Sequence, residues 1–417
     1  MSTSEHPNAD VRMRGFVEKV SVSEARTWLQ SALEKLGSVG DEKVSLETVA
    51  GRVLAADVVS NVNVPEFERA MMDGFAVRAT DIESASLRGP VSLEVVGESF
   101  PGKAFEGLVS AGKSVRAMTG SKLPEGADAV LPVEQTCAGS GEQVLAVNSI
   151  SPGRNVGGVG EDIRAGEVVL RAGRVLRPQD VGVLSSIGVK QVSVVRRPRV
   201  RIVVTGDELL PAGSAPQADR IVDANGPMLA ALVSRDGGEP IYPGIVPDDR
   251  EAILAALKDD AEVVLVSGGT SVGQEDHVPS LLAEHGELAI HGVAMRPASP
   301  VGMGLMDGRL VFLLPGNPVA CLCGYDFFAG AAIRSRGGRA TDWPYRSVLS
   351  TLSAELKSPV GRLDYIRMLL EQGQAKPVPK SGASVLSSTT RADGFVVIPA
   401  DCEGYQAGTE VELFLYD

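Results

Sequence analysis

Between residues 200 and 336 the sequence alternates short β-branched runs with segments of helical apolar spacing, and this alternation limits the possible folds more than any other feature. Such alternation predicts right-handed crossovers and a mostly parallel sheet with helices on both faces. The expected strands are 200–204, 241–246, 263–266, 288–293 and 310–314. The expected helices are 227–235, 250–257, 279–284 and 319–333.

Three of these strands end in short polar or glycine-containing loops, at 205–208, 267–273 and 315–318. The middle loop, Ser-Gly-Gly-Thr-Ser-Val-Gly, has little side-chain bulk over its backbone N–H groups, which suits a phosphate. Glu275 and Asp276 follow this loop and could face a metal ion. Taken alone, the loop could equally be a tight turn. Because ligands lie at the carboxyl ends of parallel strands, three such loops together favour a binding site.

The flanking regions have different patterns. Ser21–Glu24 resembles a capping box before a predicted helix over 25–36, and residues 44–59 predict a short helix or turn followed by a strand. Short strand patterns with Gly/Pro turns over 90–150 indicate a β module, and the tail 345–417 indicates a small barrel or sandwich. The predicted fold class is therefore multidomain α/β plus β.

Composition excludes several classes of function. A net charge of −13 and 4% aromatic residues argue against nucleic-acid binding. We find no apolar run of membrane-spanning length and no signal-peptide core, so we expect a soluble cytoplasmic protein. The four cysteines and four histidines lack disulfide or zinc spacing, and Cys321 and Cys323 are expected in the core.

Seven motifs in a fixed order resemble molybdopterin molybdenumtransferases, the MoeA-type enzymes related to the gephyrin E domain. In chain order they are Ala70-Met-Met-Asp-Gly-Phe-Ala, Met118-Thr-Gly with Pro124-Glu-Gly-Ala-Asp-Ala-Val, Gly160-Glu-Asp, Thr205-Gly-Asp-Glu-Leu, Ser267-Gly-Gly-Thr-Ser-Val-Gly, Leu314-Pro-Gly-Asn-Pro and Gly361-Arg-Leu-Asp-Tyr. The resemblance covers roughly residues 20–417.

The resemblance implies an elongated, four-part subunit. Domain I comprises 15–60 and 150–196, domain II the β module 61–149, domain III the α/β molybdopterin-binding domain 197–338, and domain IV the C-terminal β-barrel 339–417. It implies a homodimer whose active site is shared between subunits. The implied activity inserts molybdenum from molybdate into adenylylated molybdopterin, releases AMP and requires Mg²⁺.

The resemblance also assigns residues to roles. The implied catalytic residues are Asp73, Thr119, Glu208, Asp248, Asp276 and Arg362. Those implied to bind the pterin or the oxyanion are Thr205, Gly206, Ser267, Gly268, Gly269, Ser271, Gly273, Arg296, Ser299, Pro315, Gly316, Asn317 and Ser388, with Ser387 as an alternative to the last. The implied metal ligands are Asp73, Asp162, Glu208 and Asp276. Carboxylate oxygens suit a hard cation, and guanidinium and hydroxyl donors suit molybdate.

Several alternatives stay open at the level of sequence. Asp248 could be a helix cap, and Arg362 could pair with Asp364 in its own turn. Many family members have Lys-Pro-Gly-Lys-Pro where this chain has Arg296-Pro-Ala-Ser-Pro, so Ser299 replaces a lysine. The alternative functions are therefore a tungstate-preferring paralogue or a non-catalytic molybdopterin-binding scaffold; a nucleotide pyrophosphatase would not need the two β domains.

Overall fold

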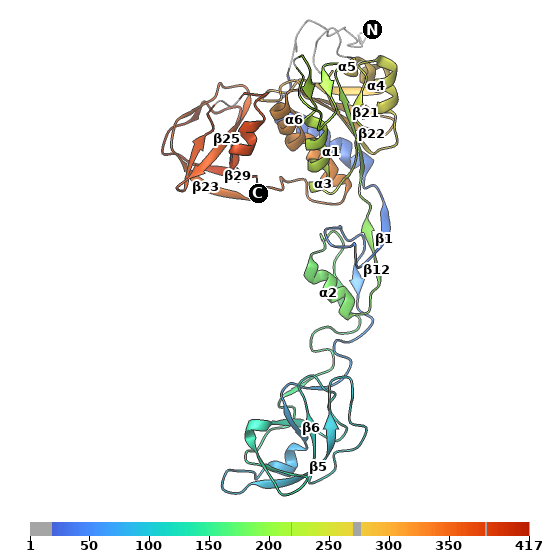
Figure 1. Cartoon of the computed structure of the whole chain (residues 1–417), viewed down its shortest axis with the longest axis vertical. Helices are drawn as coiled ribbons and strands as arrows, with labels where there is room; N and C mark the ends of the chain where they lie inside the picture. The colour runs from blue at the N-terminus through green and yellow to red at the C-terminus, as the bar shows by residue number, and fades with distance from the viewer. Residues whose placement is uncertain (1–18, 218, 270–276, 380–381, 417) are drawn as a thin grey trace, which may run out of the picture. The chain divides into compact units, whose positions relative to one another are not determined.

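The computed structural model describes residues 19–217, 219–269, 277–379 and 382–416 (Figure 1). Its backbone contacts divide the chain into two compact units. Unit 1 comprises residues up to 43, 51–55 and 193 onwards, and unit 2 comprises 44–50 and 56–192.

Unit 1 contains a seven-stranded sheet flanked by helices. Its strands are β13 (Arg199–Thr205), β16 (Glu239–Ile241), β17 (Ile245–Val246), β18 (Val263–Ser267), β19 (Glu287–His291), β21 (Gly302–Met306) and β22 (Arg309–Leu314). Its helices are α1 (Val22–Leu36), α3 (Asn225–Arg235), α4 (Arg250–Leu257), α5 (Val278–His285), α6 (Pro318–Gly324), the π-helical turn η3 (Tyr325–Ala329) and α7 (Gly330–Arg336). A separate two-stranded ladder consists of β14 (Leu209–Leu210) and β15 (Ile221–Val222).

The sheet order is β16-β13-β18-β22-β21-β19, with β17 also pairing with β13. The strands β16, β17, β13, β18 and β22 are parallel, and β21 pairs antiparallel with both β22 and β19. The mostly parallel sheet predicted from the sequence is confirmed. The predicted strand 241–246 is interrupted, because Pro243 and Gly244 separate β16 from β17.

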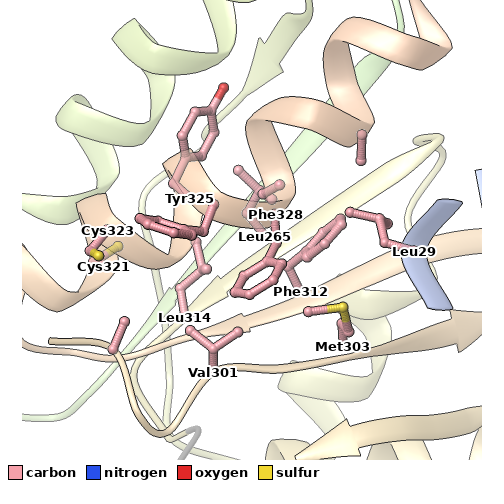
Figure 2. Close-up of a cluster of buried hydrophobic side chains, with 14 of the residues drawn as sticks. Leu29, Leu265, Val301, Met303, Phe312, Leu314, Cys321, Cys323, Tyr325 and Phe328 are labelled. Carbon is pink, nitrogen blue, oxygen red and sulfur yellow. The ribbon is translucent and has the colours of Figure 1, made fainter. Parts of the chain in front are cut away.

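Alternate residues of the central strands enter two separate cores. Ile202, Leu265 and Phe312 pack against α1, α3, α6 and α7, whereas Val203 and Val264 pack against α4 and α5. This division follows from the two-residue period of a strand and places helices on both faces. Figure 2 shows the first core, where Leu265 and Phe312 lie beside Phe328 and the Tyr325 hydroxyl points away from the sheet.

A buried charge network joins the helices above this core. Asp236 follows α3 and Asp326 lies in η3, and both carboxylates are about 1% exposed. Arg235 lies 3.0 Å from each, and Arg334 of α7 lies 3.0 Å from Asp236. The Tyr325 hydroxyl donates to Asp236 at 2.9 Å. These contacts compensate carboxylates that would be very costly to bury alone.

The C-terminal part of unit 1 is a five-stranded barrel. The order β25-β26-β23-β29-β27 closes through pairing of β27 with β25, and β20 adds to β25 at the edge. The elements are β20 (Met295–Arg296), β23 (Ser347–Leu352), β24 (Leu356–Lys357), β25 (Leu363–Glu371), β26 (Gln374–Pro377), α8 (Ser387–Arg391), β27 (Gly394–Ile398), β28 (Gly404–Tyr405) and β29 (Glu410–Leu415). The barrel alternative is thus confirmed over the sandwich.

Unit 2 is built mainly on a six-stranded sheet of order β7-β4-β6-β5-β9-β8. These strands are β4 (Gly74–Val77), β5 (Val91–Ser99), β6 (Lys113–Ala117), β7 (Ala129–Pro132), β8 (Thr136–Ala138) and β9 (Gln143–Ala146). The remaining elements of the two units are β1 (Asp41–Ser45), β2 (Val58–Val59), β3 (Arg69–Ala70), η1 (Ala79–Ile82), η2 (Val133–Gln135), β10 (Val156–Gly157), β11 (Val168–Leu170), α2 (Pro178–Ser186) and β12 (Gln191–Val195). Residues 44–59 carry a turn between strands instead of a helix.

Candidate functional site

A pocket of about 480 Å³ lies at the carboxyl ends of β13, β18 and β22. The three loops predicted from the sequence all line it. Their lining residues are Thr205 and Glu208 after β13, Ser267, Gly268 and Gly269 at the end of β18, and Pro315, Gly316 and Asn317 after β22. We call this the carboxylate pocket, because Glu208 and Asp223 are the charged groups among its described lining residues.

Two glycines allow these loops to approach one another. Gly268 has a φ of +97°, and a Cβ there would lie 2.1 Å from the Thr205 carbonyl oxygen. Gly206 has a φ of +147°, and a Cβ there would lie 2.7 Å from Glu208 Oε2. A left-handed backbone favours glycine at both positions, and the backbone carbonyl beside Gly268 also leaves no room there for a Cβ. The loop after β18 therefore packs directly on the end of β13.

Asp248 belongs to this cluster of loops and does not cap α4. The Thr205 hydroxyl donates to Asp248 Oδ1 at 2.9 Å. The cap is Asp249, whose side chain accepts from the backbone N–H groups of Glu251 and Ala252. Asp248 thus fixes the side chain of a pocket-lining residue.

Sequence reasoning missed two pocket residues, Asp223 and Asn225. Asn225 is 7% exposed, and its Nδ2 donates to Ser267 Oγ and to the Gly316 carbonyl oxygen, both at 2.8 Å. Its Oδ1 is buried without a hydrogen-bond partner among the described residues. The signal was the polar run Asp-Ala-Asn-Gly at the start of a helix, which is also typical of an ordinary helix start.

Asp223 holds Asn225 in place. The Asp223 carboxylate accepts from the backbone N–H groups of Asn225 and Gly226, at 2.9 and 3.0 Å, and from the Tyr242 hydroxyl at 2.5 Å. Burial and the hydrogen bond to Asp223 raise the pKa of Tyr242 above its usual value, so the hydroxyl keeps its proton. Asn225, held in place by Asp223, therefore links the loop after β18 to the loop after β22.

A second pocket of about 840 Å³ adjoins the first and shares Pro300, Pro315 and Asn317 with it. Five basic residues line it, namely Lys19, Arg296, Lys357, Arg362 and Arg367. The acidic residue among its described lining residues is Asp364. We call it the basic pocket, and its charge suits an anion.

Two of the oxyanion residues predicted for this region, Arg296 and Ser299, line the basic pocket. The Ser299 hydroxyl is buried and has no partner among the described residues. Arg362 also lines the pocket and pairs with Asp364, with Nε 2.9 Å from Oδ1. Ser388 is fully buried and donates to the Val385 carbonyl oxygen, so it lines neither pocket.

Asp73 and Thr119 lie together in unit 2. The Thr119 backbone N–H and hydroxyl both donate to Asp73 Oδ1 at 2.8 Å. These two hydrogen bonds, the backbone one first, hold the pKa of the exposed Asp73 carboxyl below its usual value. Asp162 is exposed in the same unit, in the turn after β10.

Ser271, Gly273 and Asp276 lie outside the described residues. Over the described ranges, no group of three or more His, Cys, Asp or Glu side chains is arranged to hold a metal ion. Glu208 lines the carboxylate pocket, and its carboxylate accepts no hydrogen bond from the described residues, whereas Asp223 and Asp248 already accept hydrogen bonds. This donor set fits Mg²⁺, which needs one or two carboxylates when substrate phosphates supply other oxygens.

Comparison with known families agrees with this architecture. Residues 20–188 match the MoeA N-terminal region (domain I and II), 201–335 the probable molybdopterin binding domain, and 350–416 the MoeA C-terminal region (domain IV). The chain belongs to the MoeA family. The resemblance inferred from the seven motifs is confirmed.

Relatives of the MoeA family match nearly the whole chain. A molybdopterin molybdenumtransferase of Staphylococcus aureus is 31% identical over 96% of this chain and 97% of its own length. One from Haemophilus influenzae is 32% identical over 89% and 93%. Two crystal structures of a molybdopterin biosynthesis MoeA protein from Pyrococcus horikoshii have TM-scores of 0.82 and 0.80, at 32% and 33% identity, each covering 96% of this chain and all of theirs.

A membrane span would need a longer and more apolar helix than any found in the described parts of the chain.

Proposed function

We propose that this chain inserts molybdenum from molybdate into adenylylated molybdopterin and releases AMP. Membership of the MoeA family supports a transferase role in molybdenum cofactor biosynthesis. The observation that carries the finer assignment is that a pocket lined by carboxylates adjoins a basic one at the ends of the parallel strands. Such a pair suits a substrate with a pyrophosphate in one pocket and a separate oxyanion substrate in the other.

The carboxylate pocket is proposed to hold the pyrophosphate. The glycines at 268, 269 and 316 leave room for phosphate oxygens close to the backbone. Glu208 would hold Mg²⁺, which neutralises developing phosphate charge when bound. Thr205, fixed by Asp248, and Ser267, fixed by Asn225, would orient the phosphates.

The basic pocket is proposed to hold molybdate. Arg296 and the Ser299 hydroxyl offer donors to a tetrahedral dianion, and no described residue pairs with the Arg296 guanidinium. Arg362 is held by Asp364, which limits its freedom and fixes the direction of its remaining N–H groups. Catalysis by this arrangement is positioning plus charge neutralisation, without a protein nucleophile.

Asp73 and Thr119 are proposed to complete the site from a second copy of the chain in a homodimer. Their support is the hydrogen-bonded pair itself, an exposed carboxylate ionised through the neutral pH range. Exposed apolar side chains lie near it in sequence, with Met71 and Met72 43% and 39% exposed. Exposed methionines of this kind suit a surface that a partner covers.

The test is AMP release from adenylylated molybdopterin with molybdate and Mg²⁺. We expect Glu208→Gln to slow release roughly 100-fold, because one charged group acting on the transition state contributes about that much. Glu284→Gln on α5 is the matched control, since Glu284 is a half-exposed surface carboxylate paired with Arg250. Its rate should equal that of the unmodified protein.

No AMP release above the protein-free background would refute the proposed reaction. Tight pterin binding without turnover would then favour a molybdopterin-binding scaffold. The Ser299 hydroxyl, buried and without a partner among the described residues where many relatives carry lysine, favours testing tungstate beside molybdate. Faster turnover with tungstate would identify a tungstate-preferring paralogue.

A further inference from the structure

Arg367 is the most deeply buried cation of the basic pocket. It is 3% exposed and lies in the middle of β25. Ile366 and Met368 of this strand face the barrel interior, whereas Tyr365 packs in the core beside the sheet. By strand alternation Arg367 shares the side of Tyr365, where the barrel meets α6. It lines the basic pocket from this buried position.

The charge of Arg367 has no carboxylate partner among the described residues. Its Nε and Nη1 atoms are buried without hydrogen bonds, and Nη2 reaches the Gly382 carbonyl oxygen at a long 3.4 Å. Burial lowers the pKa of Arg367 from its usual value. Two other buried arginines of the described residues pair with carboxylates, Arg52 with Glu42 and Arg334 with Asp236. The buried Arg336 has short hydrogen bonds to the carbonyl oxygens of Leu36 and Gly37. A buried guanidinium without an anion is costly, so its presence needs an explanation.

The neighbours of Arg367 leave its charge uncompensated. Asp364 pairs with Arg362, and the other charged groups among the described lining residues of the basic pocket are cations. Within the part of the chain that the structure describes, the Ser299 hydroxyl in the same pocket also lacks a partner. Two unpartnered buried donors in one cavity are what a site for an acceptor-rich ligand requires.

We propose that Arg367 is a specificity residue of the basic pocket, whose guanidinium binds a tetrahedral oxyanion that enters there. This rests on the proposed function and deepens it by naming a buried recognition residue beyond Arg296 and Arg362. The oxyanion is free molybdate or a phosphate group, since both present several acceptor oxygens to a guanidinium fork.

The test measures anion binding without turnover. Molybdate, tungstate, phosphate and sulfate are titrated separately into the full chain by calorimetry, in a buffer that lacks these anions. We expect Arg367→Met to bind the preferred anion roughly 10- to 100-fold more weakly, the effect of losing hydrogen bonds from a charged donor. The affinity of Arg367→Lys should lie between those of Arg367→Met and the unmodified chain, because lysine keeps the positive charge and loses the planar fork of N–H donors.

Thermal melting gives a second readout, because the substitution that weakens anion binding should raise the stability of the anion-free chain. Without anion, Arg367→Met should melt at a higher temperature than the unmodified chain, because an unpaired buried charge is removed. The control Arg334→Met should melt at a lower temperature and bind anions unchanged, because it leaves Asp236 with a weakened network.

Three results would overturn the proposal. They are equal anion affinity in Arg367→Met and the unmodified chain, no binding of any of the four anions, and a lower melting temperature of Arg367→Met without anion. The first would leave the proposed reaction standing, because AMP release is measured separately. Dependence on Arg367 with molybdate or with phosphate supports the proposal and identifies which oxyanion the pocket accepts.

Discussion

At the scale of single residues, Asn225 is important because one amide group fixes two loops. Its Nδ2 faces the Gly316 carbonyl oxygen, which can only accept, so the orientation of the amide follows from its surroundings. Ser267, the other acceptor, is itself 1% exposed at the end of β18. Loss of this donor would free both loops.

We expect Asn225→Asp to reduce kcat/KM for AMP release roughly 10- to 100-fold, since displaced phosphate-binding loops misplace the reacting groups. The carboxylate would face a carbonyl oxygen that needs a donor. The same amide-to-acid change at the exposed Gln143 of β9 is the control and should have no effect. Unchanged kinetics of Asn225→Asp, measured over a full substrate range, would contradict this role.

Thr119 controls the ionisation of Asp73. Thr119→Val removes the hydroxyl donor and keeps the backbone N–H, so the pKa of Asp73 should rise toward, without reaching, its usual value. Carbon-13 NMR titration of the Asp73 carboxyl measures this directly. Because the lowered pKa lies far below neutrality, Asp73 stays ionised at pH 6–8 in both proteins. A pKa that does not change would show that the hydroxyl bond is absent in solution.

At the scale of elements, the strands of the central sheet could be predicted because burial on both faces requires continuous apolar sequence. Val263–Val266 and Leu310–Leu314 are examples. The antiparallel β21 was missed, because glycines at 302 and 304 hide its strand pattern. The three loops could be predicted from where strands end. Asn225 and Arg367 could not, because their roles depend on contacts between segments far apart in sequence.

The start of helix α2 depends on one buried carboxylate. Asp180 is 4% exposed and accepts from Arg174 at 2.9 Å, from the Arg177 backbone N–H, and from the Arg177 side chain. The Arg174 hydrogen bonds, and then those of Arg177, hold the pKa of Asp180 well below its usual value against the effect of burial. The stability that ionised Asp180 contributes to the fold is therefore complete above the usual aspartate pKa. It is lost as the pH falls through the lowered pKa of Asp180 in the folded protein.

We expect Asp180→Asn to destabilise unit 2 by about 1.5–3 kcal/mol at pH 7, the contribution of hydrogen bonds to a charged group. The difference from the unmodified chain should shrink below about pH 4, where the aspartate begins to take up protons. Both tryptophans, Trp28 and Trp343, lie in unit 1. Circular dichroism should therefore detect an earlier transition, while tryptophan fluorescence melting stays unchanged.

Equal shifts in both signals would show that the two units unfold together.

At the scale of the whole molecule, the proposed site needs residues from both units, and the proposed homodimer would supply them from different copies. Asp73 and Thr119 belong to unit 2, whereas Glu208 and the two pockets belong to unit 1. Complementation between inactive variants can test this arrangement without further structural data.

We expect Asp73→Asn and Glu208→Gln to be strongly impaired separately and to recover about a quarter of normal activity after co-refolding in equal amounts, because half of the symmetric dimers are mixed and one site in each is intact. AMP release measures the recovery. Mixing without refolding is the control and should give no more activity than the separate variants if subunits do not exchange. No recovery after co-refolding would show that each site is built from one chain.

The π-helical turn η3 accommodates one extra residue in the helix that it interrupts. A π turn holds one residue more than an α turn, so deleting one residue from Tyr325–Ala329 would leave a continuous α-helix. Side chains beyond the deletion would keep nearly their present directions, so Arg334 would still face Asp236 and Ile333 would stay in the core. A deletion within α7 would instead rotate every later side chain by about 100° about the helix axis. This helix can therefore change its length by one residue at η3 far more readily than at any of its regular turns.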